Sequence, residues 1–257
     1  MRIDIATLFP DMCETVLNES IIGRARKNEL VTLYCHNIRD YTQDKHNRVD
    51  DTPYGGGMGM VMQADPIFRC YEAVKERSNS KPYVIYLSPQ GTPLKQKKCL
   101  SLAQHQHLLL LCGHYEGVDE RVLEEIVDEE ISIGDYVLTG GELAALVLVD
   151  SVVRLCEGVL ASPECFEEES HYNGLLEYPQ YTRPAVWRGQ EVPPVLLSGH
   201  HGNIAKWRRA QSLWRTLKCR PDMLEKVEFQ KGDADLLYWI RREMEEDSNE
   251  KSSPEEV

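Results

Sequence analysis

Short apolar runs alternate with longer amphipathic stretches over the first 160 residues. Apolar runs of about four to eight residues favour buried strands, whereas apolar residues three and four apart favour helices. The pattern predicts strands at 2–8, 31–35, 83–87, 108–112 and 131–138, and helices at 11–28, 64–77, 95–105, 118–129 and 142–156. This order is typical of an α/β fold with a largely parallel sheet.

Four stretches rich in glycine, proline and polar residues follow or lie beside these strands. They are Ser88-Pro89-Gln90-Gly91, residues 112–121, residues 133–138 and Thr139-Gly140-Gly141-Glu142. In open α/β sheets, ligands bind beyond the carboxyl ends of the strands. We therefore expect these loops to form the walls of one small-molecule site.

The composition changes after residue 156. Residues 157–180 contain six glutamates and neither lysine nor arginine. We expect a first domain at 1–160, a linker at 161–174, a small helical domain at 175–246 and a disordered acidic tail at 247–257. In the helical domain, Asn203 is expected to cap a helix packed by Trp207 and Trp214.

The formal net charge of −13 is unevenly distributed. Residues 181–220 carry eight arginine or lysine residues against one acid, Glu191. Such a local excess can bind nucleic-acid phosphates, because screening limits electrostatic attraction to about 8–10 Å. A solvated helix face would have the same composition, so the charge alone leaves both interpretations open.

Other features narrow the class of protein. No signal peptide is recognisable, and no apolar run approaches the roughly 20 residues that span a membrane. Eight scattered cysteines without a CxxC pair favour reduced thiols, so we expect a cytoplasmic protein. No phosphate-binding GxxxxGK[ST] motif is present. No metal-ligand spacing is visible, which leaves any dependence on Mg²⁺ open.

Residues 40–62 form a long segment with little helical pattern, containing Gly55, Gly56, Gly57 and Gly59. The glycine spacing does not match the dinucleotide-binding GxGxxG fingerprint. The segment is either a mobile loop or a lid whose backbone approaches a flat base or a phosphate.

Six motifs together resemble the bacterial tRNA (guanine-N1)-methyltransferases of the knotted SPOUT superfamily. They are residues 50–57 (DDTPYGGG), 88–91 (SPQG), 113–121 (GHYEGVDER), 133–138 (IGDYVL), 181–184 (YTRP) and 198–201 (SGHH), and the resemblance extends over residues 1–246. It implies a trefoil knot in which the chain between about 85 and 145 threads through itself, a rare arrangement. It also implies a homodimer whose active sites lie at the subunit interface, and methylation of guanosine 37 beside the tRNA anticodon.

The resemblance further implies a site for S-adenosylmethionine as methyl donor. The backbone groups expected to bind adenine and ribose belong to Leu87, Gly113, Ile133, Tyr136 and Leu138. The positions expected to allow close approach of the ligand are Pro89, Gly91, Gly140 and Gly141. Tyr115 and Glu116 are expected near the ribose and the amino acid moiety, and Gly134, Asp135 and Val137 belong to the same site.

Methylation of guanine N1 needs a base near N1 and a cation near the carbonyl oxygen, where negative charge develops. By the resemblance, Glu169 is the base and Arg154 is the cation. Arg154 could instead pair with Asp150 one helical turn earlier. This chain has Glu169-Ser170-His171 where most family members have aspartate followed by Ser-Phe. The neighbours Glu167 and Glu168 are expected to be solvated linker charges.

The resemblance assigns tRNA contacts to the glycines of the 55–59 loop and to Arg183, His201, Asn203, Trp207 and Arg208. Arginines bind phosphates, and aromatic or histidine rings stack on splayed bases. Trp207 and Trp214 have a competing interpretation as core residues. Two other functions remain as alternatives: a knotted methyltransferase acting on ribose or on an rRNA base, and a non-catalytic RNA-binding protein.

Overall fold

The computed structural model describes residues 1–162, 166, 168–238 and 240. The chain divides into two compact units, residues 1–162 (unit 1) and the residues from 163 onward (unit 2), which are described separately. Glu167, the predicted tail at 247–257 and residues 241–246 of the predicted helical domain lie outside the described residues.

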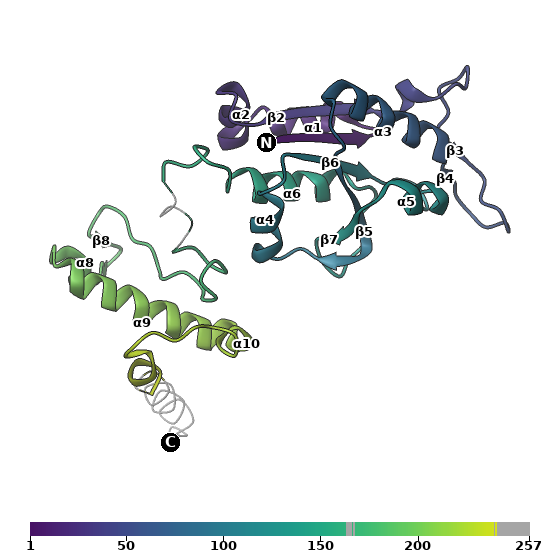
Figure 1. Cartoon of the computed structure of the whole chain (residues 1–257). Coiled ribbons are helices and arrows are strands. Elements are labelled where there is room, and N and C mark those ends of the chain that lie inside the picture. Colours follow the sequence, from purple (N-terminus) through teal and green to yellow (C-terminus); the bar gives the residue numbers. More distant parts are fainter. Residues whose placement is uncertain (163–165, 167, 239, 241–257) are drawn as a thin grey trace. The chain divides into compact units, whose positions relative to one another are not determined.

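Unit 1 is built on a five-stranded parallel sheet (Figure 1). The strands lie in the order β2-β1-β6-β5-β7, and each neighbouring pair is parallel. Their bounds are β1 Arg2–Thr7, β2 Thr32–Asn37, β5 Tyr83–Pro93, β6 His107–Cys112 and β7 Glu129–Ser132. The predicted α/β class with a parallel sheet is confirmed.

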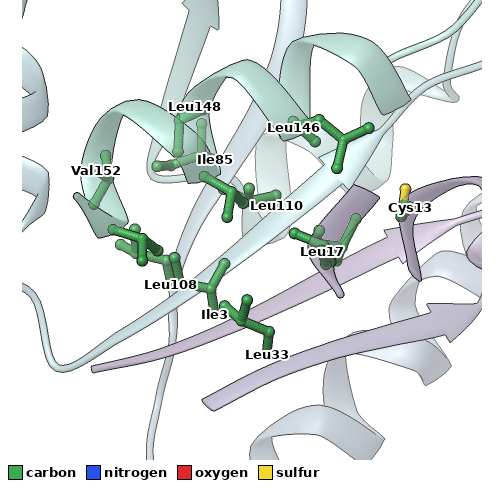
Figure 2. Close-up of a cluster of buried hydrophobic side chains, with 14 of the residues drawn as sticks. Ile3, Cys13, Leu17, Leu33, Ile85, Leu108, Leu110, Leu146, Leu148 and Val152 are labelled. Atoms are coloured by element: carbon green, nitrogen blue, oxygen red, sulfur yellow. The ribbon is translucent and has the colours of Figure 1, made fainter. Parts of the chain in front are cut away.

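Helices cover both faces of this sheet. One apolar cluster joins the sheet to α1 (Pro10–Leu17), α2 (Ser20–Lys27), α4 (Gln96–Leu102) and α6 (Glu142–Val153). Figure 2 shows its side chains from the sheet, α1 and α6. The cluster on the other face joins it to the 3₁₀ helix η1 (Ile38–Tyr41), α3 (Ala64–Ser78) and α5 (Glu120–Ile126).

The central strand β6 explains why the sheet has two cores. All six of its residues are buried. Leu108 and Leu110 belong to one cluster and Leu109 and Leu111 to the other, because successive strand side chains point to opposite faces. The run of leucines thus indicated correctly a strand buried on both faces.

The single helix predicted at 11–28 is wrong. The chain forms α1 and α2, separated by Asn18 and Glu19. Ser20 has a positive φ of 54°. A side chain at Gly23 would collide with the Asn18 carbonyl, at 2.2 Å. The glycine therefore lets α2 begin directly against the end of α1, an arrangement that apolar spacing does not reveal.

Two other predicted elements are shorter than expected. The strand predicted at 131–138 ends as β7 at Ser132, whose hydroxyl donates to the Gly134 carbonyl (3.0 Å) and accepts from its N–H (3.2 Å). These bonds turn the chain, so residues 133–138 form a loop. The helix predicted at 118–129 is limited to α5, since Asp119 caps its start and Val127 is already extended.

The turn predicted at 88–91 is part of β5, which continues to Pro93. Its pairing with β7 shifts register between Leu87 and Thr92. A bulge of this kind bends a strand without ending it. The polar composition therefore indicated an irregularity in the strand and not its end.

Residues 52–60, which we call the glycine loop, lie between two short antiparallel strands, β3 (Asp50–Asp51) and β4 (Val61–Met62). Gly55, Gly56, Gly57 and Gly59 all have positive φ. Met62 N–H donates to the Gly117 carbonyl (2.9 Å), and Asp119 N–H donates to the Met62 carbonyl (3.0 Å). The loop is therefore anchored beside residues 117–119.

A buried polar network that sequence reasoning missed joins three strands of unit 1. The carboxylate of Asp4 on β1 is fully buried and accepts hydrogen bonds from His36 on β2 (2.6 Å), His107 on β6 (2.8 Å) and Arg2 (2.6 Å). Burial alone would raise the pKa of Asp4, but these bonds outweigh it and hold the pKa well below its usual range.

Unit 2 is mainly helical. Among its described residues are the hairpin β8 (Val186–Trp187) and β9 (Gln190–Glu191), with α8 (Pro194–Leu197), α9 (His201–Cys219), α10 (Pro221–Leu224) and further helical residues at 233–238. A small apolar cluster of Leu175, Leu213 and Ile240, with Trp214 packed against it, forms the core among the described residues. The hairpin was not predicted.

The expected cap of α9 is wrong by three residues. His200 is the N-cap, and its Nδ1 accepts from the Asn203 N–H (3.2 Å), so Asn203 lies inside the first turn. None of the seven described cysteines is in a disulfide, and Cys165 lies outside the described residues. No helix in the described part of the chain is long and apolar enough to cross a membrane.

Candidate active site

A cavity of about 360 Å³ opens beside the carboxyl ends of β5, β6 and β7. This volume lies within the range of small-molecule sites, about 300–1,000 Å³. Its walls come from four segments: residues 86–90, residues 113–118 with Glu120 and Leu123, residues 130–134, and residues 136–141 with Ala144. The structure thus brings the predicted loops together around one cavity.

Most of the predicted cofactor residues line this cavity. They are Leu87, Pro89, Gly113, Tyr115, Glu116, Ile133, Gly134, Tyr136, Val137, Leu138, Gly140 and Gly141. Gly91 and Asp135 do not line it, and Asp135 is exposed. Sequence reasoning missed His114, Val118, Thr139 and Ala144, although the first three lie inside or beside the quoted motifs.

Two glycines, Gly91 and Gly141, lie where the backbone packs closely against another segment. A Cβ on Gly91 would lie 2.5 Å from the backbone of Glu130 and Ile131. One on Gly141 would lie 2.7 Å from the Cα of Cys112. Backbone meets backbone at both points, so no side chain can move aside. Close packing within the protein therefore requires glycine at both positions, and Gly141 also lines the cavity.

The cavity wall combines carboxylates with apolar and backbone groups. Glu116, Glu120 and Glu130 line it together with Leu87 and Leu138. The Nδ1 atom of His114 is buried and has no hydrogen-bond partner among the described residues. A buried polar atom without a partner is costly, so a bound ligand that supplies one is favoured. The wall suits a ligand with a positive charge and a flat apolar part.

The glycine loop contacts this wall through Glu116. The Glu116 N–H donates to the Met60 carbonyl (3.0 Å), and its side chain packs against Gly59 so closely that a Cβ there would lie 2.4 Å away. The predicted lid and the predicted cofactor site are therefore in direct contact within unit 1.

Arg154 is half-buried and is the C-cap of α6. Leu143, Val147 and Asp150, on the same side of this otherwise buried helix, are exposed. The spacing of three and four residues places Arg154 at the end of that stripe. Its backbone N–H donates to the Asp150 carbonyl (3.3 Å).

Glu169 is half-buried in unit 2, within a turn that we define as residues 168–177 (the Glu169 turn). Glu169 N–H donates to the Phe166 carbonyl (3.2 Å), and Tyr172 N–H donates to the Glu169 carbonyl (3.3 Å). Because Arg154 belongs to unit 1, the two predicted catalytic residues lie in different units.

The model of the family described as tRNA (Guanine-1)-methyltransferase TrmD matches residues 1–226. The chain belongs to this family. A tRNA (guanine-N(1)-)-methyltransferase of Ruminiclostridium cellulolyticum is 60% identical over 227 residues, which are 88% of this chain and 97% of that protein. Proteins of the same name from Dehalococcoides mccartyi and Desulforamulus reducens are each 55% identical, covering 95% and 94% of this chain and 98% and 95% of their own length.

In this member of the TrmD family, the predicted tRNA contacts that belong to unit 2 occupy different environments. His201 and Asn203 are exposed on the first turn of α9, and Arg183 is exposed before the hairpin. Trp207 is half-buried, with its ring 6.3 Å from that of Tyr181, whereas Trp214 packs on the core as the competing interpretation held. Arg208 lies against Tyr178 and Glu168.

Proposed function

We propose that this chain transfers a methyl group from S-adenosylmethionine to N1 of guanosine 37 in tRNA. Membership of the tRNA (Guanine-1)-methyltransferase family carries this proposal, because the match covers residues 1–226 and thus the whole of unit 1. The cavity supports it by placing the predicted loops around one space. A cytoplasmic location belongs to the same proposal, since the substrate is tRNA.

The residues present fit the methyl donor. Leu87, Leu138 and Ala144 offer apolar contact for its adenine, and the surrounding turns offer backbone groups. Glu116 and Glu130 offer carboxylates to its ammonium group. His114 Nδ1 offers a buried polar atom that needs a partner. When bound, S-adenosylmethionine supplies an electrophilic methyl group on a positively charged sulfur.

The chemistry at the acceptor follows from the protonation of guanine. N1 carries a proton at neutral pH and is a poor nucleophile until that proton is removed. Glu169 accepts the N1 proton, and Arg154 stabilises the negative charge that develops on the guanine carbonyl oxygen. The guanine must leave its stack to reach the cavity.

The sheet order supports the proposal that the chain is knotted. β5 lies between β6 and β7, so the chain leaving β6 returns to the sheet on the far side of β5. The segment after β7 then passes close to the end of β6, where Gly141 N–H donates to the Gly113 carbonyl (2.9 Å). His114 also bridges to Gly140. These close contacts are expected where one segment threads past another.

Exposed apolar side chains support the proposal of a homodimer. Leu143 and Val147 on α6 are 50% and 48% exposed, and Val16 on the adjoining helix α1 is 51% exposed. Leu143 and Val147 lie one helical turn apart on the same side of α6, and exposed apolar residues that share a face are typical of an interface. A second copy of the chain is the proposed occupant, because a twofold dimer lets the same face serve both partners.

Mixing two inactive variants tests the shared active site. Arg154→Ala and Glu169→Gln are each expected to be inactive as homodimers. If each site takes Arg154 from one subunit and Glu169 from the other, random exchange leaves about one site in four intact. Methyl transfer should then reappear on mixing. A mixture that stays inactive after proven subunit exchange would contradict the shared site.

Nucleoside analysis tests the reaction itself. Unmodified tRNA transcripts with guanosine or adenosine at position 37 are incubated with methyl-labelled S-adenosylmethionine, digested and analysed by mass. We expect 1-methylguanosine only from the guanosine transcript. A ribose-methylated nucleoside would favour the first alternative, and tRNA binding without transfer would favour the second.

A further inference from the structure

The Glu169 turn is attached to α9 by a series of contacts within unit 2. Ser170 Oγ accepts from the Glu177 N–H (2.9 Å), which closes the turn on itself. Thr216 Oγ1 accepts from the Leu176 N–H (2.9 Å), and an Arg215 Nη donates to the Glu177 carbonyl (3.1 Å). The carboxyl end of the turn is therefore fixed to the second half of α9.

The other end of the turn is held by a cluster of three side chains: Glu168, Tyr178 and Arg208. The Tyr178 hydroxyl donates to the Glu168 carboxylate (2.8 Å). The Arg208 guanidinium lies over the Tyr178 ring, 4.7 Å from its centre, and 3.7 Å from the same carboxylate. Glu168 precedes Glu169 directly, so the cluster contacts the residue next to the proposed base.

The Arg208 guanidinium already faces groups within unit 2, because one of its faces covers the Tyr178 ring and one Nη lies 3.7 Å from Glu168. Lys206, on the same helix, is exposed and has no ion pair within the described part of the chain. Of these two cations on α9, Lys206 is the one free to meet a phosphate.

We propose that Arg208 is a positioning residue for Glu169, acting through Glu168 and Tyr178, and not a phosphate contact. This inference rests on the proposed function, because it gives Arg208 a task in methyl transfer. It replaces the tRNA-contact role that the resemblance assigned to Arg208. Misplacement of a catalytic group by about 1 Å can cost about 10²-fold in rate. Arg208 therefore acts on the rate constant of transfer more than on the affinity for tRNA.

A charge exchange tests the proposal on the full-length protein. Arg208→Glu, Glu168→Arg and the double variant are compared in single-turnover methyl transfer at saturating tRNA, with tRNA affinity measured separately by filter binding. Each single variant should transfer about 10- to 100-fold more slowly, because like charges then repel in the cluster. The double variant should recover about tenfold, since opposite charges face each other again.

Two results would overturn the positioning role. One is a double variant no faster than Arg208→Glu. The other is an Arg208→Glu variant whose rate at saturation is unchanged while its affinity falls, as a phosphate contact requires. Lys206→Glu is the matched control on α9 and should weaken tRNA binding with little change in the saturated rate.

Failure of the proposed function gives a different pattern. If the parent protein makes no 1-methylguanosine, the reaction assignment itself is wrong. If the parent is active but Glu169→Gln transfers normally, the base assignment is wrong and Arg208 has no base to position. These two measurements therefore distinguish failure of the reaction assignment and failure of the base assignment from failure of the positioning role of Arg208.

Discussion

The cavity in unit 1 and the Glu169 turn in unit 2 are held by different kinds of contact. At the cavity, backbone meets backbone: Gly91 lies against Glu130 and Ile131, and Gly141 lies against Cys112. At the turn, side chains meet at a partly exposed surface, where Glu168 and Arg208 retain 62% and 42% of their side-chain exposure. The first arrangement leaves no freedom to adjust, whereas the second can shift as side chains change conformation.

This difference matches what each region is proposed to do. A site built from turns must keep its shape to bind the same small molecule each time. A base that meets an extruded nucleotide gains from a support that can adapt when the RNA arrives.

The largest effect is expected for Glu169→Gln. The amide cannot accept the N1 proton, so the single-turnover rate should fall by about 10²- to 10⁴-fold. Binding of S-adenosylmethionine, measured by calorimetry, should be unchanged because the cavity belongs to unit 1. If Glu169→Gln also bound S-adenosylmethionine more weakly, the cavity and the Glu169 turn would not have separate roles.

Asp4→Asn should destabilise unit 1 by about 3–5 kcal/mol, because it leaves buried partners without their carboxylate. The matched change in unit 2 is Asp233→Asn, which breaks the pair with Arg209. The four tryptophans are residues 187, 207, 214 and 239, all beyond unit 1. Tryptophan fluorescence should therefore detect unfolding of unit 2 in the Asp233→Asn variant but not the destabilisation of unit 1 by Asp4→Asn. Circular dichroism should detect both. Equal fluorescence shifts would contradict independent units.

The Asp4 network also predicts a dependence on pH. The folded pKa of Asp4 lies below its ordinary value, so its contribution to stability is present above the unfolded pKa of about 4. That contribution is lost as pH falls from there toward the folded pKa. In unfolding measurements at decreasing pH, Asp4→Asn should lose less stability than the parent. If the free energies of unfolding of the parent and of Asp4→Asn fell equally with decreasing pH, Asp4 would not be the source of this pH-dependent stability.

Gly141→Ala should destabilise unit 1 by about 1–3 kcal/mol, because the new methyl group meets backbone at 2.7 Å. Binding of S-adenosylmethionine should weaken with it, since the start of α6 has to move. Gly202→Ala is the matched control in unit 2, where the new methyl group would meet a His200 ring atom at an ordinary contact distance of 3.4 Å. It should be neutral or stabilise α9 by up to about 1 kcal/mol.

The smallest effect is expected for Tyr178→Phe. It removes the hydroxyl that donates to Glu168 but keeps the ring under Arg208. Loss of one such hydrogen bond is worth about 0.5–1.5 kcal/mol, so the transfer rate should fall only a few-fold. A rate loss as large as that of Arg208→Glu would show that the hydroxyl, and not the cation, holds the turn.

The sequence by itself determined the class of fold and the location of the cavity. The leucines of β6 required burial on both faces, and the loops after the strands could only gather at the carboxyl edge of a parallel sheet. The motifs also determined the family, which the comparisons confirm. These conclusions rest on local patterns and on residue identity, which tertiary structure does not alter.

Only the tertiary structure decided which partners those residues meet. The sequence predicts Gly91 and Gly141 near a ligand, and the structure adds that each packs against backbone far away in the chain. The sequence predicts that Arg208 contacts tRNA, and the structure adds Glu168 and Tyr178 as its neighbours. His36 and His107 gave no signal, because Asp4 reaches them only across neighbouring strands. Contacts between residues far apart in the chain depend on how the elements pack, and no local pattern encodes that packing.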